Sequence, residues 1–327
     1  MSHQVQIAAQ SVQFSVEEHQ TILQAALDHG VNLPHACKTG SCGGCRCKVL
    51  DGNYLSSAPT GVSNGVNSDD SILTCQTYAL SDILLDVPNF CAIPVKNLPA
   101  KITYLHKDNG LAILKLTLPA NQKFEFIAGQ FIDVTAQGIT RSYSVASAPN
   151  NTQQLELHIR YRQGGAFSEI LWNSLAVGSL VRIKGPLGNF SLKNSVVPLL
   201  LVATGTGFAP LKAILEHLRD TNSSQHLHLV WGNYRPEDFY LRETLAEFQQ
   251  FLKLTVALCA SESAVTGFYS GMVTDYISEN FADLSNYEVY ACGNPAMITA
   301  VSELAINKLG LPTHNFFADS FSPANLQ

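Results

Sequence analysis

Four cysteines form the clearest chemical pattern in the chain. Cys37, Cys42 and Cys45 are spaced C-x4-C-x2-C, and Cys75 follows further along the sequence. Cysteine thiolates are soft ligands, and four of them around a [2Fe–2S] cluster is the arrangement typical of this spacing. Glycines between these cysteines suit a loop that wraps tightly around a cluster, because glycine adopts positive φ angles. We therefore expect these four cysteines to bind iron.

Two other metal sites fit this pattern less well. A structural zinc site needs a second close pair of cysteines or histidines, and Cys75 has none beside it. A Rieske centre needs two histidines in place of two cysteines, with a C-x-H spacing that the sequence lacks. Cys47 lies just beyond Cys45, where we predict the start of a strand, and its side chain is expected to serve packing.

A second group of residues has the chemistry of a flavin site. Arg141, Tyr143 and Ser144 form the pattern R-x-Y-S. An arginine pairs with a pyrophosphate, a tyrosine lies against an isoalloxazine ring, and a serine hydroxyl hydrogen-bonds the redox nitrogen. Further on, glycines precede an apolar helix whose first N–H groups suit a diphosphate. The residues of that turn are Gly165, Ala166, Phe167 and Ser168.

Each of these motifs alone is also compatible with an ordinary turn, in which Ser168 serves as a helix N-cap. Their order along the chain predicts that FAD is bound.

A third group lies at the ends of buried strands. A strand predicted at 199–203 leads into Gly205, Thr206 and Gly207 and then into a helix, and such glycines let the backbone approach a pyrophosphate. The third glycine of G-x-G-x-x-G is absent, so a purely structural turn stays an alternative. A later strand ends at Cys292 and Gly293, where the thiol either contacts a nicotinamide ring or packs as a small buried side chain. We predict that this group binds NAD(P)H.

The choice between the two nicotinamide nucleotides depends on the ends of the middle strands. A bound 2′-phosphate needs arginine or lysine there. Acidic residues dominate these ends, and Glu262 would repel a phosphate, whereas Arg235 is the one residue that favours it. We therefore expect NADH rather than NADPH.

Three patterns of elements must position these groups. Residues 1–91 contain short alternating strands around a helix at 21–29, and the proline-containing segment 92–98 is predicted to be a linker. Residues 99–193 alternate short strands with turns, which predicts an antiparallel β-barrel. Residues 194–327 alternate strands and helices, which predicts a parallel sheet with helices on both faces. The fold class is therefore multidomain, combining α+β and α/β parts.

The end of the chain carries an aromatic segment around a single acid, Asp319. This segment, 316–321, either covers the flavin or only docks the C-terminus against the fold.

Composition narrows the class of protein. Of 327 residues, 46% are hydrophobic and 14% charged, which is enough apolar material for several cores and too little charge for disorder. The net charge is −6 without a Lys/Arg run, so we expect no nucleic-acid or membrane partner. The apolar runs are too short for a spanning helix, and the N-terminus lacks the features of a signal peptide. We expect a cytoplasmic protein.

Together these motifs resemble the ferredoxin–NADP reductase superfamily with an N-terminal plant-type ferredoxin domain, over nearly the whole chain. The chain is similar to reductase components of aromatic-ring dioxygenases and related oxygenases, and equally to CDP-6-deoxy-Δ3,4-glucoseen reductases. The resemblance implies a β-grasp-like [2Fe–2S] domain at 1–91, an FAD-binding barrel at 99–193 and an NAD(P)H-binding domain at 194–327. It also implies that Ser144, Cys292 and Asp319 tune hydride transfer, although many relatives carry Glu at the position of Asp319.

We predict an NADH-dependent reductase that passes electrons through FAD and the cluster to a partner protein. Hydride transfer needs no side-chain acid or base, so the protein supplies position and electrostatics. The expected partner is an oxygenase or hydroxylase component, and the alternative is a dehydrase of deoxysugar synthesis. A third hypothesis is a non-catalytic module with zinc in the cysteine loop and a degenerate nucleotide site, which would be colourless.

Overall fold

A computed structural model describes residues 2–8, 10–35, 38, 40, 43–57, 71–87, 90, 92–150, 153–262 and 265–321. The chain divides into two compact units. Unit 1 holds the described residues of 1–97 together with 184–189, and unit 2 holds those of 98–183 and 190–323.

Unit 1 is built on a five-stranded sheet with the strand order β2-β1-β7-β3-β5. The first two strands are antiparallel, whereas β1 and β7 run parallel. The bounds are β1 (Ser2–Ile7), β2 (Gln13–Glu17), β3 (Arg46–Asp51), β5 (Ser71–Leu73) and β7 (Ile83–Asp86). A two-stranded sheet joins β4 (Tyr54–Ser56) to β6 (Thr77–Ala79), and the short helix η1 (Thr74–Gln76) precedes β6.

The helix of unit 1, α1 (Ile22–Asp28), has ends that the sequence encodes locally. The hydroxyl of Thr21 accepts a hydrogen bond from the Gln24 N–H at 3.2 Å, which caps the first turn. Gly30, with a φ of +75°, follows the last turn and lets the chain reverse direction. Burial of Ile22, Leu23, Ala25, Ala26 and Leu27 places the apolar stripe of the helix in the core.

The first part of unit 2 contains most of a six-stranded sheet with the order β11-β10-β13-β8-β9-β12. An isolated bridge between Val145 and Leu157 joins the two ends of this sheet. The bounds are β8 (Lys96–Asp108), β9 (Leu111–Thr117), β10 (Phe131–Ala136), β11 (Ile139–Ser144), β12 (Gln154–Arg160) and β13 (Leu180–Leu187). The helix α2 (Ala166–Asn173) follows β12 and buries Phe167, Ser168 and Leu171.

Strand β8 begins earlier than the sequence indicates, inside the segment 92–98 predicted to be a linker. It therefore contains Pro99, which has no N–H to donate to a neighbouring strand. Its pairing with β9 starts only at Lys101, so this ladder loses no hydrogen bond at the proline.

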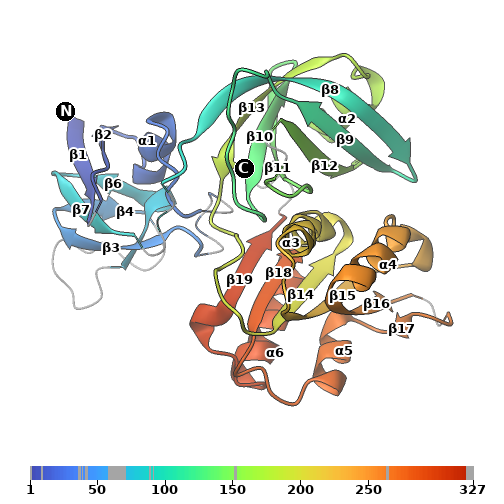
Figure 1. The fold of residues 1–327 in the computed structure, drawn as a ribbon. Coiled ribbons are helices and arrows are strands. Elements are labelled where there is room, and N and C mark those ends of the chain that lie inside the picture. Colours follow the sequence, from blue (N-terminus) through green and yellow to red (C-terminus); the bar gives the residue numbers. More distant parts are fainter. Residues whose placement is uncertain are drawn as a thin grey trace. The chain divides into compact units, whose positions relative to one another are not determined.

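The second part of unit 2 is a six-stranded sheet with the order β17-β16-β15-β14-β18-β19, and each pairing described in it is parallel (Figure 1). The strands are β14 (Leu199–Thr204), β15 (His226–Asn233), β16 (Lys253–Ala260), β17 (Tyr269–Ser270), β18 (Glu288–Gly293) and β19 (Phe316–Ser320). The helices are α3 (Phe208–Asp220), α4 (Arg242–Phe251), α5 (Val273–Asn280) and α6 (Pro295–Asn307).

Alternate residues of β14 enter the cores on the two faces of this sheet. Leu199 and Leu201 pack with residues of α3 and α4, whereas Leu200 and Val202 pack with residues of α5 and α6. A strand covered on both faces has apolar residues at consecutive positions. Its sequence therefore does not alternate between apolar and polar residues, and periodicity alone does not show which residues point to which face. Figure 1 shows the two pairs of helices on opposite faces of the sheet.

The aromatic C-terminal segment forms β19, the edge strand of this sheet. It pairs with β18 from Val289 and Phe316 through to Gly293 and Ser320. Among the described residues, no helix is long and apolar enough to cross a membrane.

Candidate functional site

Two of the four predicted cluster ligands lie within the described residues and are brought together. Cys45 and Cys75 are buried, and their sulfur atoms are 3.2 Å apart. Cys45 is held by Thr74, whose N–H and hydroxyl both donate to the Cys45 carbonyl, at 3.1 and 3.2 Å. Cys37 and Cys42 lie outside the described residues. Paired soft donors at this separation fit a shared metal group, since thiolate is the ligand that iron–sulfur clusters use.

Cys47 differs from these two cysteines in its surroundings. It lies within β3, pairs with Ile72 and is buried, as expected for a packing residue. Burial, together with the charges of Cys45 and Asp86, raises the pKa of the Cys47 thiol to about 12. At neutral pH its side chain is therefore a protonated small hydrophobe.

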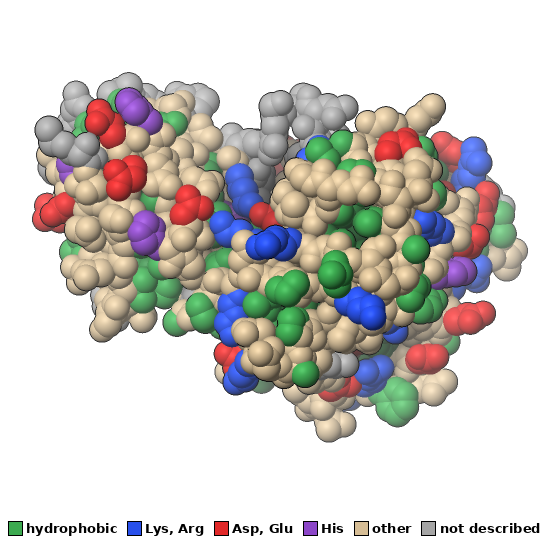
Figure 2. All heavy atoms as spheres, turned by 90° about the horizontal axis from the view of Figure 1, so that it is seen from above, with side chains coloured by type: hydrophobic (Ala, Val, Ile, Leu, Met, Phe, Trp, Pro, Cys, Tyr) green, Lys and Arg blue, Asp and Glu red, His purple; other side chains and the backbone are tan. Residues whose placement is uncertain are grey.

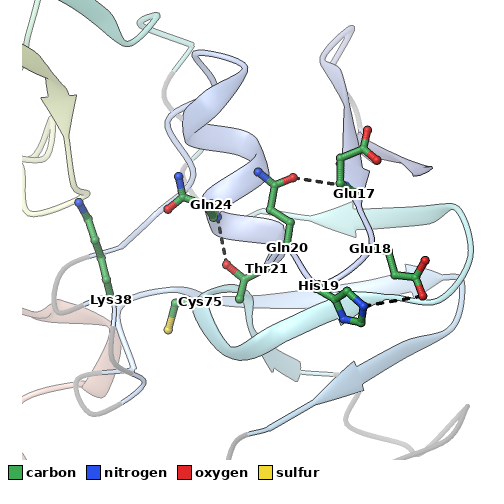
Figure 3. A pocket seen from close by; sticks show the side chains of 8 residues that line it. All are labelled: Glu17, Glu18, His19, Gln20, Thr21, Gln24, Lys38 and Cys75. Atoms are coloured by element: carbon green, nitrogen blue, oxygen red, sulfur yellow. Dashed lines mark hydrogen bonds and ion pairs between the residues drawn. The ribbon is translucent and has the colours of Figure 1, made fainter. Parts of the chain in front are cut away.

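An open depression of about 570 Å³ lies beside Cys75 on unit 1 (Figure 3). Most of its lining is polar, and the residues are Glu17, Glu18, His19, Gln20, Thr21, Gln24, Lys38 and Cys75. Figure 3 shows the two glutamates and the histidine at the end of β2, with Cys75 and Lys38 on the other side. On the face drawn in Figure 2, unit 1 carries mainly acidic and histidine side chains among uncharged ones.

The predicted flavin residues of β11 lie beside the helix α2. The ring of Tyr143 is 5.3 Å from that of Phe167, and burial raises the pKa of the Tyr143 phenol despite the charges of Arg141 and Arg162. Arg162, whose backbone N–H and carbonyl both bond to the Ser168 hydroxyl, also lies beside these residues and was not predicted from the sequence. Its place just before the glycine turn was the signal that could have identified it.

The glycine turn differs from the alternative in which Ser168 is the helix N-cap. Gly165, rather than Ser168, is the N-cap residue of α2. The buried hydroxyl of Ser168 lies 2.8 Å from the Arg162 carbonyl and accepts the Arg162 N–H at 3.2 Å. Phe167 is also buried, in the core of this part of the unit. Both side chains therefore hold the turn, and the groups free to meet a diphosphate are N–H groups of the first helical turn.

The turn after β14 contains two glycines with different surroundings. Gly205 has a φ of +55°, and among the described residues none lies within 4 Å of the Cβ that a substitution would add. A Cβ on Gly207 would instead lie 2.1 Å from the Cys292 carbonyl oxygen. The open space at Gly205 fits the close approach of a pyrophosphate, and the contact at Gly207 holds the turn against β18.

Three predicted residues from three separate strands meet at this edge of the sheet. Asp319 of β19 lies in register beside Cys292 of β18, and both are buried. The hydroxyl of Ser144, at the end of β11, donates to an Asp319 carboxylate oxygen at 3.4 Å. Burial and the neighbouring Asp319 raise the pKa of the Cys292 thiol well above its ordinary value. The thiol therefore stays protonated at neutral pH.

The ends of β15 and β16 carry the residues that bear on nucleotide preference. Arg235 Nε lies 3.5 Å from a carboxylate oxygen of Glu262, and both side chains are more than half exposed. The Glu262 N–H donates to the Tyr234 carbonyl at 3.0 Å, which holds the two loops together. The one arginine that would attract a 2′-phosphate is thus paired with an acid.

Three family models match successive parts of the chain. A 2Fe-2S iron-sulfur cluster binding domain matches residues 5–80, an oxidoreductase FAD-binding domain matches 103–192, and an oxidoreductase NAD-binding domain matches 201–303. Their order is the order of the three groups of residues described above.

Similar proteins match over nearly the full length. The CDP-6-deoxy-L-threo-D-glycero-4-hexulose-3-dehydrase reductase of Yersinia pestis is 36% identical over 332 residues, which cover 99% of this chain and 100% of that protein. Reductase component 1 of terephthalate 1,2-dioxygenase from Comamonas is 32% identical and covers 98% of both chains. A crystal structure of an Amycolatopsis cytochrome P450 reductase has a TM-score of 0.83 at 26% identity, covering 98% of this chain and 99% of that one.

Proposed function

Because the chain belongs to the iron–sulfur flavoprotein reductases of the ferredoxin–NADP reductase family, we propose roles for its individual residues. The protein is an NAD(P)H-dependent oxidoreductase in which electrons pass from NAD(P)H through FAD and a [2Fe–2S] cluster to a partner protein. When bound, FAD accepts a hydride and releases single electrons, and the cluster carries one electron at a time.

We assign the cluster to Cys37, Cys42, Cys45 and Cys75. The approach of the last two sulfurs to 3.2 Å supports this assignment. For the three parts of the chain we propose a β-grasp ferredoxin domain at 1–91, an antiparallel FAD barrel and a parallel-sheet domain at 194–327. The barrel, predicted at 99–193, starts at Lys96 with β8, so the linker predicted at 92–98 is shortened to 92–95. The bridge between Val145 and Leu157 supports the barrel, because it joins the two ends of its sheet.

The flavin assignment gives each residue a separate task. Arg141 pairs with the diphosphate, Tyr143 lies against the ring system and Ser144 hydrogen-bonds its redox nitrogen. Ala166 offers its N–H group at the start of α2. Gly165 serves as the N-cap residue, with its own N–H donated to the Arg162 carbonyl at 2.9 Å, and the side chains of Phe167 and Ser168 fix the shape of that turn.

The nucleotide assignment places the pyrophosphate at Gly205, Thr206 and Gly207 and the nicotinamide near Cys292 and Gly293. A protonated, buried Cys292 thiol offers a small uncharged surface to the ring rather than a nucleophile. Asp319 accepts the one hydrogen bond that the Ser144 hydroxyl can donate, so towards the flavin nitrogen the serine oxygen is left as an acceptor. The observation that carries this proposal is that Ser144, Cys292 and Asp319 converge from three strands.

NADH is the proposed donor, because Glu262 both pairs with Arg235 and would repel a 2′-phosphate. The proposed acceptor is an oxygenase component, as in the terephthalate dioxygenase and cytochrome P450 systems of the relatives. A second candidate is a deoxysugar dehydrase, which the 36% identity to the Yersinia pestis reductase favours. Mixing the NADH-reduced protein with each purified acceptor, and following electron uptake, distinguishes the two candidates.

Anaerobic titration with NADH and, separately, with NADPH tests the cofactors and the donor. We expect NADH to bleach the flavin absorption and to produce the half-integer-spin EPR signal of a reduced cluster, with a much weaker response to NADPH. A colourless protein, or a reduced protein without that signal, would contradict the proposal.

Substitution of Ser144 by alanine tests the converging residues. Loss of a hydrogen bond worth about 1.4 kcal/mol should slow flavin reduction by NADH roughly tenfold in stopped-flow experiments, with the cluster signal intact. Ser142→Ala is the matched control, because Ser142 lies on the same strand but bonds Asp133 instead. If flavin reduction by NADH were as fast in Ser144→Ala as in Ser142→Ala, Ser144 would have no role at this site.

A further inference from the structure

A buried polar cluster in unit 2 remains unused by the assignments above. It consists of Glu156, His158, Lys212, Glu216 and Tyr240, which come from β12, α3 and the segment before α4. We call these residues the polar cluster. It includes two carboxylates and a lysine with little exposure, and such charges are stable inside a protein only when they are closely paired.

Lys212 is the centre of the polar cluster. Its ammonium nitrogen lies 2.6 Å from a Glu216 carboxylate oxygen and 3.1 Å from one of Glu156, and it donates to the Ala146 carbonyl at 3.1 Å. Only 7% of its side chain is exposed. All three donor directions of the ammonium group are therefore used within the protein.

The bonds of Lys212 and Glu216 reach the segment that follows Ser144. Lys212 holds the Ala146 carbonyl, and the other Glu216 oxygen accepts the Ala148 N–H at 2.8 Å. Both side chains belong to α3, which begins at Phe208, immediately after the glycine turn. One helix therefore links the backbone beyond the proposed flavin serine to the turn proposed for the nucleotide.

A second connection leads from the polar cluster to the same turn. His158 contacts Glu156 through Nε2 and the Tyr240 hydroxyl through Nδ1, each at 2.9 Å. The Tyr240 ring packs edge-on against Trp231, with ring centroids 5.3 Å apart. The indole N–H of Trp231 donates to the Gly205 carbonyl at 3.0 Å.

We propose that Lys212 is a positioning residue for hydride transfer, which sets the Ser144 segment against the helix that starts at the nucleotide turn. This inference rests on the proposed function, because it takes Ser144 as the flavin side and Gly205 to Gly207 as the nucleotide side. Hydride transfer requires reacting atoms about 3 to 3.5 Å apart, and a misplacement of about 1 Å can cost a hundredfold in rate. A fixed link between the two sides therefore controls the rate of the step.

Stability alone does not explain an ionic link of this kind. Replacement of a buried ion pair by packed apolar residues is often neutral or stabilising, so a core that needed only cohesion would not require Lys212. The directional bonds to Ala146 and Ala148 hold two backbone groups at set positions, which apolar contacts do not do.

The test compares Lys212→Met with Lys115→Met in the holoprotein. Lys115 lies 3.7 Å from Glu156 but on the outer side, with 37% of its side chain exposed, so it controls for the loss of a lysine near the same acid. We expect Lys212→Met to slow flavin reduction at saturating NADH about ten- to a hundredfold. Its apparent affinity for NADH, its flavin content and its cluster EPR signal should change little, and Lys115→Met should match the wild type.

Hydrogen–deuterium exchange supplies a readout that is independent of turnover. The Ala148 amide should exchange at least tenfold faster in Lys212→Met than in the wild type, because Glu216 loses the partner that holds its carboxylate in place. A primary kinetic isotope effect with 4-deuterated NADH should also rise, as expected when hydride transfer itself becomes limiting. Wild-type rates and wild-type exchange in Lys212→Met would overturn the inference.

Removal of Lys212 leaves two carboxylates without their cation, so this variant can fail to fold. Glu216→Gln keeps an oxygen for Lys212 but weakens the bond to Ala148, and Tyr240→Phe removes a single hydroxyl. Both should slow flavin reduction at least threefold with little change in NADH affinity, and wild-type rates in both would also overturn the inference. Absence of NADH-dependent bleaching in the wild type would instead contradict the proposed function.

Discussion

At the scale of single residues, the two glycines of the nucleotide turn carry different constraints. Gly205 needs its backbone conformation and faces open space, whereas Gly207 needs the absence of a side chain because the Cys292 carbonyl lies where a Cβ would be. The same sequence motif thus contains one position suited to a ligand and one required by the fold.

Alanine at each position separates these two roles. Gly207→Ala should cost about 3 kcal/mol of stability, because backbone atoms must move apart. Gly205→Ala should cost about 1 kcal/mol for its left-handed backbone and should raise the KM for NADH, because the new methyl group enters the space proposed for the pyrophosphate. Thermal unfolding and NADH kinetics measure the two effects. A larger loss of stability in Gly205→Ala would contradict this reading.

The pair formed by Arg235 and Glu262 bears on nucleotide preference. Glu262→Gln removes the acid paired with Arg235, so the arginine becomes free to meet a 2′-phosphate. We expect kcat/KM for NADPH to rise about tenfold, which corresponds to ~1.4 kcal/mol, with little change for NADH. Glu237→Gln, at an exposed acid near Arg235 in the same loop, is the matched control. An unchanged NADPH-to-NADH ratio would show that the pair does not set the preference.

At the scale of elements, β12 and α3 are joined by charged groups whose ionisation is coupled to folding. Burial opposes ionisation of Glu156, but the hydrogen bond from His158 and the charge of Lys212 outweigh it and hold the Glu156 pKa at about 2. Burial lowers the pKa of His158, although its bond to Glu156 opposes that shift. The folded cluster therefore holds an ionised acid and a neutral histidine at neutral pH.

The histidine makes folding stability depend on pH. Unfolded His158 gains a proton as the pH falls below about 6.5, whereas the folded side chain stays neutral, so unfolding becomes more favourable. Each pH unit in this window costs up to about 1.4 kcal/mol for one histidine. We expect the melting temperature of wild type to fall between pH 7 and 5.5, and that of His158→Gln to fall less.

Glu156 affects folding stability in a lower pH range than His158 does. Its folded pKa lies below the unfolded value, so its contribution persists above about pH 4.5 and is lost only as the pH falls towards 2. His228, whose pKa is lowered by burial and by His226, adds to the wild-type slope but is retained in the variant. The difference between the two profiles therefore reports His158, and identical slopes would contradict its burial as a neutral group.

At the scale of the whole molecule, the two parts of unit 2 are joined by a common apolar core, whereas unit 1 is a separate compact unit. One core of unit 2 contains Ala128 and Phe190 together with residues of β14, α3 and α4. The two parts of unit 2 therefore share apolar packing in addition to the polar cluster. Unit 1 has its own buried strands and helix.

Separate unfolding of the two units is the expected consequence. On heating, the visible absorption of the cluster should be lost in a different transition from the release of FAD, because the two cofactors belong to units with different cores. Calorimetry combined with absorption and flavin fluorescence measures both transitions. A single transition in all three signals would mean that the units unfold as one.

Much of this organisation is readable from short-range spacing in the sequence. The cysteine loop, the R-x-Y-S strand and the glycine turn each lie within a few residues, so their chemistry is visible without a fold. The alternation of strands and helices after residue 194 likewise reflects local periodicity. The helix α1 has its cap, apolar stripe and terminal glycine in adjacent positions, which is why its bounds were predictable.

Contacts between distant parts of the chain were decided only by tertiary structure. Ser144 and Asp319 meet because β11 ends where β19 joins β18, and no local pattern marks the last strand as a partner of the others. Lys212 reads in the sequence as one more helical lysine, and only packing against β12 and the Ala146 segment makes it a buried ionic link. Side-chain type and spacing specify which chemistry is available, whereas long-range strand pairing and burial specify which groups meet, because those depend on the free energy of the whole fold.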